Sequence, residues 1–250
     1  MLWVNGDLPS YATASIQSFL KQGHSVHLWT YNLEIKAPPN CVIRNAEDVL
    51  SADKIFGYAH GEYKGHLSGF SDWFRYQLLF DQGGWWSDID VICVQPFVST
   101  QRFCFASNWE PKIFKCVNNN VIFSASAGED IFRDAIAICE QRGSAVEHAE
   151  TGPTLLFKLV QAHSLLDCVA EPYVFNPISY YDIAKVVMPK YRLIAYSWYR
   201  RIRSRAPIYV NHSETMGVHL FSALLNRQTN LTALLGDDQY RSSYLRSLVV

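Results

Sequence analysis

Asp88 and Asp90 are the residues whose type and spacing point most directly to chemistry. In an extended segment, residues two apart point to the same face, so these carboxylates should lie side by side. Their flanks, Trp85-Trp86 and the run 91–94, are apolar, and bare charges there would be costly without compensation. Mg²⁺ or Mn²⁺ would compensate them and keep open positions for phosphate oxygens. Two solvated aspartates at an exposed strand end are the alternative at this point.

Asp72 and Arg75 form a second polar pair, three residues apart in a predicted helix over 72–82. That spacing places them on the same side of the helix. A carboxylate accepts and a guanidinium donates, so together they could hold vicinal hydroxyls of a sugar. The alternative is an intrahelical ion pair worth a few tenths of a kcal/mol.

The ends of this helix indicate how the two pairs could meet. Ser71 is the predicted N-cap, and Gly83-Gly84 should terminate the helix and turn the chain sharply. We expect a strand over 85–94, interrupted at Asp88 and Asp90. The turn could therefore bring the start of the helix and the two aspartates into one site.

The elements around these pairs predict an α/β fold. A strand at 2–4, a helix from Pro9 to a stop at Gly23, and a strand at 26–30 form a β-α-β unit, which favours a parallel sheet with a right-handed crossover. The later elements that we expect are a strand at 41–43, a short helix at 46–50, helices at 131–141 and 154–162, strands at 208–211 and 217–221, and a helical tail from 223. The glycine-rich segment 57–70 is either a mobile lid or a plain connector.

The composition fits one folded domain. The chain has 250 residues, of which 49% are hydrophobic and 18% are charged. A net charge of −1 gives no global attraction to nucleic acid. No signal peptide is visible, and no apolar run approaches the ~20 residues of a membrane span.

The six cysteines and one basic run bear on the location of the protein. The cysteines are scattered and form no C-x-x-C pair, which indicates reduced core residues in a cytoplasmic protein. The segment Arg200–Arg205 contains four arginines beside Trp198 and Tyr199. It could contact an anionic acceptor or the inner face of a membrane peripherally, and a solvated loop is the alternative.

The combined pattern resembles a known family. The segments Ser71-Asp72-Trp73-Phe74-Arg75-Tyr76 and Gly83-Gly84-Trp85-Trp86-Ser87-Asp88-Ile89-Asp90 are similar to the S-D-x-x-R-Y and G-G-x-x-x-D-x-D signature of glycosyltransferases with the DXD sugar-binding region. These are the GT32-like enzymes, related to the α-1,4-glycosyltransferases and to the glucosylating domains of large clostridial toxins. Further similar stretches are Trp3-Val4-Asn5-Gly6, Asn118–Ile122, Thr151-Gly152-Pro153 and Val218-His219-Leu220. Phe221 stands where the family often has tryptophan.

The resemblance implies a GT-A-type, Rossmann-like domain with a mixed, mostly parallel central sheet and flanking helices. Residues 1–97 would form the nucleotide-sugar half, 98–222 the acceptor half and 223–250 a helical tail. The implied activity is retaining, metal-dependent transfer of a hexose or N-acetylhexosamine from a nucleotide sugar, with UDP as the expected nucleotide. The implied acceptor is a glycan, a lipid-linked glycan or a protein, in surface polysaccharide synthesis.

The resemblance also assigns roles to residues. Asp90, Asp88 and His219 would bind Mn²⁺ or Mg²⁺, and Asp88, Asp90 and Arg75 would be the catalytic set. The donor would contact Trp3, Asn5, Gly6, Ser71, Asp72, Arg75 and Asp88, with Trp3 stacked on the base.

Other roles stay more open at the sequence level. Trp109, Glu110, Asn119 and Asn120 are candidates for the acceptor side, because an indole can face a sugar ring and amides both donate and accept. Two alternatives to a transferase are a non-catalytic nucleotide-sugar-binding protein on the same scaffold and a phosphatase of the D-x-D type with Asp88 as nucleophile.

Overall fold

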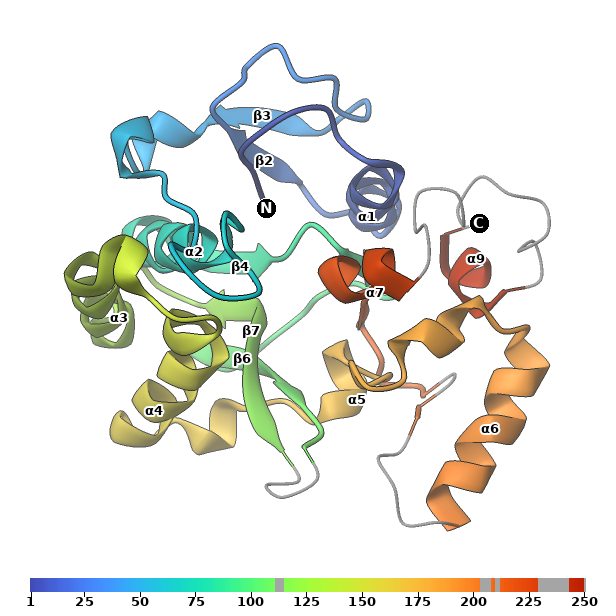
Figure 1. Cartoon of the computed structure of the whole chain (residues 1–250). Coiled ribbons are helices and arrows are strands. Elements are labelled where there is room, and N and C mark those ends of the chain that lie inside the picture. Colours follow the sequence, from blue (N-terminus) through green and yellow to red (C-terminus); the bar gives the residue numbers. More distant parts are fainter. Residues whose placement is uncertain (111–114, 203–207, 210–211, 229–242, 250) are drawn as a thin grey trace.

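The chain folds as a mixed α/β structure with strands in the middle and helices around them (Figure 1). The computed structural model describes residues 1–110, 115–202, 208–209, 212–228 and 243–249. This architecture confirms the predicted fold class and is consistent with a GT-A type.

The first 45 residues form the parallel sheet that the β-α-β pattern predicts. Strand β1 (Leu2–Trp3) pairs with β2 (His27–Thr30), and β2 pairs with β3 (Val42–Asn45), both in parallel. Helix α1 (Ser10–Lys21) makes the crossover between β1 and β2. Its apolar side is buried at Ile16 and Phe19, which pack with Leu28 of β2.

A second sheet is antiparallel, with the strand order β4-β7-β6. It contains β4 (Gly84–Ser87), β6 (Phe103–Asn108) and β7 (Cys116–Ser124). Because of this sheet and a further antiparallel pair, described below, fewer of the described strand pairs are parallel than we expected. We did not predict β6 and β7 because they carry polar serine and asparagine residues, so their apolar pattern gives only a weak strand signal.

The predicted strand over 85–94 is divided between two sheets. Strand β4 ends at Ser87 and β5 (Val91–Cys93) begins after the Asp88–Asp90 turn, where it pairs with β8 (Gly217–His219). On its other side, β5 faces α1, where the Ser15 hydroxyl donates to the Val91 carbonyl at 2.6 Å and the Ser18 hydroxyl accepts from the Cys93 N–H at 2.8 Å. The two aspartates thus lie where the chain passes from one ladder to the next.

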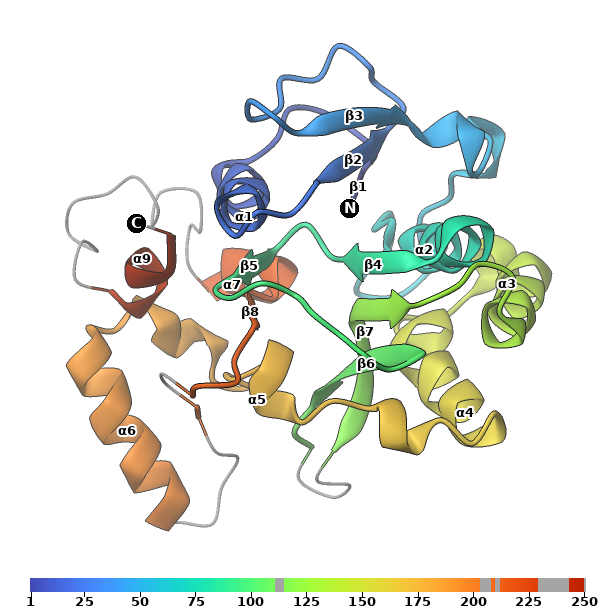
Figure 2. The same cartoon turned by 180° about the vertical axis from the view of Figure 1, so that it is seen from behind.

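Helix α2 (Ser68–Gln82) packs against β4 and β7 and carries the Asp72 and Arg75 pair (Figure 2). It begins earlier than predicted, so Ser71 lies inside the helix and is not its N-cap. The reason is Phe70, which is fully buried and extends the apolar face by one turn. The predicted stop is confirmed, because Gly83 follows the last helical residue with φ of +66°.

The remaining helices cover the two ends of the molecule. Helices α3 (Asp130–Arg142) and α4 (Leu155–Ala162) confirm two predictions. Helix α3 packs against α2, and α4 packs against α3 and β7. The opposite end holds α5 (Pro172–Phe175), α6 (Lys190–Ile202), α7 (Ser222–Gln228) and α9 (Tyr244–Val249) (Figure 1). The last two helices agree with the predicted helical tail in its described part. Residues 229–242 and 250 lie outside that part. Ile208 and Tyr209 are not in a strand, and 210–211 lie outside the described residues.

Two expectations from composition also have an outcome. All six cysteines are free, and two of them, Cys93 and Cys139, are buried. No helix among the described residues is both long enough and apolar enough to cross a membrane.

Candidate active site

Arg75 is the centre of the polar cluster. It lies on the buried side of α2, where only 3% of the residue is exposed. Its Nη2 atom is 3.2 Å from Asp72 Oδ1 and 3.3 Å from Asp88 Oδ1. Its Nη1 atom donates to the Asn119 carbonyl oxygen, and its guanidinium lies 5.0 Å from the centre of the Trp86 ring. The structure therefore brings together the helix pair and the first aspartate, as the sequence predicts.

Asp72 is held by side chains from two other parts of the chain. The Asn119 amide donates to its Oδ1 at 2.7 Å, and the Thr151 hydroxyl donates to its Oδ2 at 3.2 Å. The backbone of Gly152 passes so close that a Cβ there would lie 2.9 Å from Asp72 Oδ2 and 3.0 Å from Asn119 Nδ2. The Thr-Gly-Pro turn is therefore part of this site, a role that the sequence analysis did not assign.

Asp88 is fixed by its neighbours in β4 and β7. Its N–H donates to the Asn120 carbonyl at 2.8 Å, and the Trp86 indole N–H donates to Oδ1 at 2.9 Å. A quarter of its side chain is exposed, so the carboxylate can still be reached from outside. Arg75 and the Trp86 indole both contact Oδ1.

Asp90 is tied to the C-terminal part of the chain. Its Oδ2 accepts the backbone N–H of Ser222, the first residue of α7, at 2.8 Å. Its Oδ1 lies 3.3 Å from His219 Nε2. The β5–β8 pairing continues into this contact, because the Leu220 N–H donates to the Asp90 carbonyl at 2.9 Å. Both side chains are nearly buried.

Asp88, Asp90 and His219 meet the geometric demands of a cation site. One ligand atom from each lies within 4.8 Å of the others. Two donor atoms bound to one ion at about 2.1 Å and at right angles are about 3 Å apart, which matches the Asp90–His219 distance. Among the residues that the structure describes, none forms a hydrogen bond with the buried Nδ1 atom of His219. The oxygen-rich donor set fits Mn²⁺ or Mg²⁺, and the family resemblance implies these three residues.

The three carboxylates have different electrostatic environments. Burial raises the pKa of Asp72 to about 6, although the Arg75 guanidinium acts against this shift. Burial also raises the pKa of Asp88, again opposed by Arg75. Burial acts to raise the pKa of Asp90 too, but the His219 charge and the hydrogen bonds from His219 and Ser222 hold that pKa below its usual range. Asp90 is therefore a carboxylate throughout the physiological range.

The other predicted donor residues lie at the ends of two elements. Trp3 ends β1 and is half-buried, and its indole N–H donates to the Gly6 carbonyl at 3.1 Å. Asn5 and Gly6 follow it and are exposed, with Gly6 at φ of +74°. In parallel sheets, ligands bind beyond the carboxyl ends of the strands, which is where these residues lie. The Ser71 hydroxyl accepts from Arg75 Nη2 at 3.3 Å and so helps to orient the guanidinium.

The residues predicted for the acceptor are separated into two groups. Trp109 and Glu110 follow β6 and are half-buried, and the Tyr181 hydroxyl donates to Glu110 Oε2 at 3.4 Å. Asn119 instead contacts Asp72 and Arg75. Asn120 is fully buried, and its amide pairs with that of Asn176 through two hydrogen bonds of 3.2 Å. These contacts favour a role for both asparagines in fixing the acidic residues.

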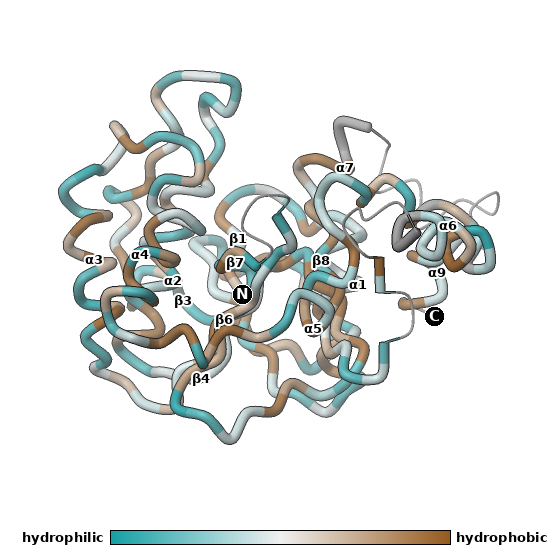
Figure 3. The backbone as a smooth tube through the Cα atoms, turned by 90° about the horizontal axis from the view of Figure 1, so that it is seen from below, coloured by the Kyte–Doolittle hydropathy of each residue, from teal (hydrophilic) through white to brown (hydrophobic). Residues whose placement is uncertain are grey.

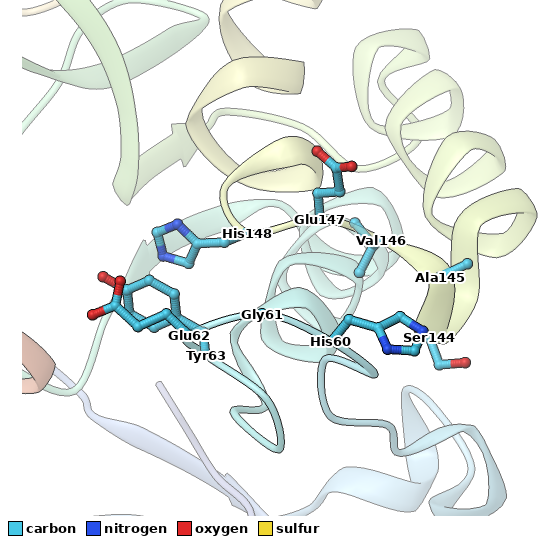
Figure 4. A pocket seen from close by; sticks show the side chains of 9 residues that line it. All are labelled: His60, Gly61, Glu62, Tyr63, Ser144, Ala145, Val146, Glu147 and His148. Carbon is cyan, nitrogen blue, oxygen red and sulfur yellow. The ribbon is translucent and has the colours of Figure 1, made fainter.

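A pocket of about 350 Å³ lies between residues 60–63 of the glycine-rich segment and residues 144–148. Figure 4 shows the rings of Tyr63 and His148 facing each other at one end and His60 beside Ser144 at the other. The ring centroids of Tyr63 and His148 are 3.8 Å apart. Thr151, which contacts Asp72, follows the lining residue His148 by three positions in the sequence. The predicted lid function of segment 57–70 stays a prediction.

Part of the chain matches a known protein family. Residues 9–112 match the family described as "Glycosyltransferase sugar-binding region containing DXD motif". The matched residues include Asp72, Arg75, Asp88 and Asp90. No curated protein matches the chain. The chain is similar to a solved structure named "PaToxG Glycosyltransferase", with 13% identity over 98% of this chain and 84% of that chain and a TM-score of 0.47.

Residues 9–112 therefore correspond to a glycosyltransferase sugar-binding region with a DXD motif. The family match assigns the motif pair, and the geometry joins it to Asp72 and Arg75 in one cluster. His219, Asn119 and Thr151 lie outside the matched residues, so their roles depend on the contacts described above. The narrower GT32-like grouping stays a prediction.

Proposed function

We propose that the chain transfers a hexose or N-acetylhexosamine from a nucleotide sugar, with Mn²⁺ or Mg²⁺ held by Asp88, Asp90 and His219. The observation that carries this proposal is that Arg75 contacts both Asp72 and Asp88. A sugar held at Asp72 and a diphosphate held at the cation would therefore meet at one guanidinium. The bond to be broken joins those two parts of the donor.

The chemistry follows from charge. Breaking the anomeric bond leaves negative charge on the departing diphosphate, and a bound divalent cation would supply Lewis-acid stabilisation of that charge. Arg75 adds a buried positive charge aimed at the same region, where low dielectric strengthens its effect. Asp72 would accept hydrogen bonds from donor hydroxyls, while Asn119 and Thr151 hold its carboxylate in place.

We propose retention of the anomeric configuration by attack on the face from which the diphosphate leaves. Asp72 already accepts hydrogen bonds from Asn119 and Thr151 and pairs with Arg75, so its surroundings favour hydroxyl recognition over nucleophilic attack. A diphosphate oxygen would then help to deprotonate the acceptor. NMR of the product tests this step, because an inverted anomeric configuration would refute it.

The nucleotide is expected to be UDP, with its base on Trp3. The hydrogen bond from the Trp3 indole to Gly6 fixes the ring at the carboxyl end of β1. Asn5 and Gly6 offer exposed backbone groups beside it. Residues 1–97 would then form the nucleotide-sugar half, 98–222 the acceptor half and 223–250 a helical tail of one domain.

We propose that the acceptor is a glycan, free or lipid-linked, in surface polysaccharide synthesis, rather than a protein. The pocket lined by residues 60–63 and 144–148 supports a glycan because aromatic rings such as those of Tyr63 and His148 can face sugar rings. Trp109 and Glu110 would contribute from the end of β6. The six free cysteines support a reducing, cytoplasmic location.

A donor screen tests the proposal directly. Purified protein is incubated with a panel of nucleotide sugars and Mn²⁺, and the released nucleoside diphosphate is measured. We expect release from one donor, and loss of that release with EDTA and in Asp90→Ala. Tight donor binding with neither transfer nor slow hydrolysis would instead support the non-catalytic alternative. Phosphate release from a phosphomonoester alone would contradict the proposal.

A further inference from the structure

Helix α6 (Lys190–Ile202) lies at the outer edge of the molecule, on the side of α7 and α9 and away from α3 and α4 (Figures 1 and 3). One side of it is anchored in the C-terminal core. Leu193 is fully buried and Ser197 is 7% exposed. The Tyr196 hydroxyl donates to Asp182 Oδ1 at 3.2 Å. The helix therefore has a fixed inner face and a fixed outer face.

The outer face of α6 exposes large aromatic side chains. Tyr191 is 67% exposed, Trp198 is 64% exposed and Tyr199 is 48% exposed. The described residues expose eight large hydrophobic side chains, so this one helix contributes three of them. Residues seven and eight apart lie on the same side of a helix, and exposed Ala195 lies between them. The aromatics therefore form one stripe and are not scattered.

The charged residues in the sequence of this segment have one sign. Lys190, Arg192, Arg200 and Arg201 belong to α6, and residues 183–213 contain no aspartate or glutamate. Arg203 and Arg205 follow in the sequence and lie outside the described residues. The chain as a whole carries a net charge of −1, so the basic character is local to this segment.

We infer that the outer face of α6 binds the surface of an anionic phospholipid bilayer. Tryptophan and tyrosine favour the interface between water and lipid, because their rings are apolar while their N–H or O–H groups stay hydrated. Basic residues are attracted to anionic headgroups, and a basic amphipathic helix lies in the plane of the interface. Since no described helix can span a bilayer, the contact is peripheral.

Vesicle flotation tests this inference without any donor or acceptor, so its result is independent of the proposed transferase activity. The full chain is mixed with phosphatidylcholine vesicles that contain or lack phosphatidylglycerol. We expect binding to the anionic vesicles only, and loss of it at about 1 M salt, where the Debye length is about 3 Å. Equal binding to both vesicles, or binding to neither, would overturn the inference.

Variants locate the surface. Tyr191→Ala combined with Trp198→Ala, and separately Arg192→Glu, should each reduce vesicle partitioning by about tenfold or more. Leu33→Ala is the matched control, because Leu33 is 56% exposed but lies outside α6. Unchanged binding in both α6 variants would show that the surface is elsewhere. Thermal melts that match the wild type show that these variants are folded.

A second copy of the chain is the rival occupant of an exposed aromatic face. Sedimentation velocity of the wild type in the absence of lipid separates the two. We expect a monomer whose sedimentation is the same in the Tyr191→Ala, Trp198→Ala double variant. A dimer that this variant dissociates would overturn the inference, because the face would then be a protein interface.

Discussion

The Nη2 atom of Arg75 lies 3.3 Å from Oδ1 of Asp88, and this ion pair joins helix α2 to the turn between β4 and β5. Asp72 lies on the other side of the same guanidinium. One buried guanidinium therefore sets the spacing between Asp72, the proposed sugar-binding carboxylate, and Asp88 of the proposed metal site. Five predictions test this cluster and the residues proposed to act with it.

Replacing Arg75 with lysine tests whether the arrangement of its hydrogen-bond donors matters in addition to its positive charge. Arg75→Lys keeps the charge but loses the fork that contacts Asp72, Asp88 and the Asn119 carbonyl at once. We expect kcat to fall by at least about a hundredfold, as expected for the loss of a transition-state donor. Steady-state kinetics of donor hydrolysis measure this. Arg133→Lys is the control, because Arg133 forms an exposed ion pair with Asp130, and wild-type kinetics of Arg75→Lys would refute the role.

Gly152 should be intolerant of a side chain. Its φ of −84° lies outside the left-handed region that favours glycine. The obstacle is Asp72 Oδ2, which would lie 2.9 Å from a new Cβ. Gly152→Ala should displace that carboxylate and raise the KM for the donor, with a stability cost of about 1–3 kcal/mol for overpacking. Kinetics and urea unfolding measure both, and an unchanged KM would contradict the placement.

Metal binding should be visible without catalysis. Mn²⁺ should raise the melting temperature of the wild type, because a ligand that binds only the folded state stabilises it. Asp90→Asn should abolish this shift, and His219→Ala should weaken Mn²⁺ binding. His163→Ala is the control, since His163 also lies beside a carboxylate, Asp134, but away from the cluster. A shift in Asp90→Asn equal to that of the wild type would remove Asp90 from the metal site.

The pH profile should report on Asp72. Its pKa is raised to about 6, and the carboxylate must be ionised to accept hydrogen bonds from a donor sugar. Below that pH the group is protonated, so kcat/KM should fall as the pH drops through about 6. The Thr151 hydrogen bond acts to lower this pKa. Thr151→Val should therefore move the acidic limb to higher pH, whereas Thr151→Ser should leave it in place.

Trp3 should contribute to nucleotide affinity. Loss of a stacked aromatic typically costs about 1–3 kcal/mol for each base. Trp3→Ala should weaken binding of the free nucleoside diphosphate by a corresponding factor in calorimetry, while Trp3→Phe should retain most of the affinity. An unchanged dissociation constant for Trp3→Ala would place the base elsewhere.

Much of the fold and the centre of the site could be predicted from the sequence, because the patterns involved are local. The β-α-β unit, the stop at Gly83 and the Asp72, Arg75, Asp88 and Asp90 constellation depend on residues near one another in the chain. The family match confirms the DXD motif, and the structure places the four side chains together.

The rest depends on contacts between distant residues. Strands β6 and β7 were not predicted because their serines and asparagines are polar. In the structure these side chains can be buried because they form hydrogen bonds, as in the Asn120–Asn176 pair. The contact of Thr151 with Asp72 spans 79 residues, and no local spacing predicts it. The early start of α2 was missed because the burial of Phe70 depends on packing with other elements.

The hydrogen bond between Ser222 and Asp90 joins positions 132 residues apart. A chain that is synthesised from its N-terminus therefore contains the whole matched region, 9–112, long before the hydrogen bond from Ser222 to Asp90 can form. Until β8 and the start of α7 have been synthesised and have packed against β5, Asp90 would lack its contacts with His219 and Ser222. The nascent protein should thus be unable to capture its cation until more than four-fifths of its length has been made, so an N-terminal fragment would be an inert module.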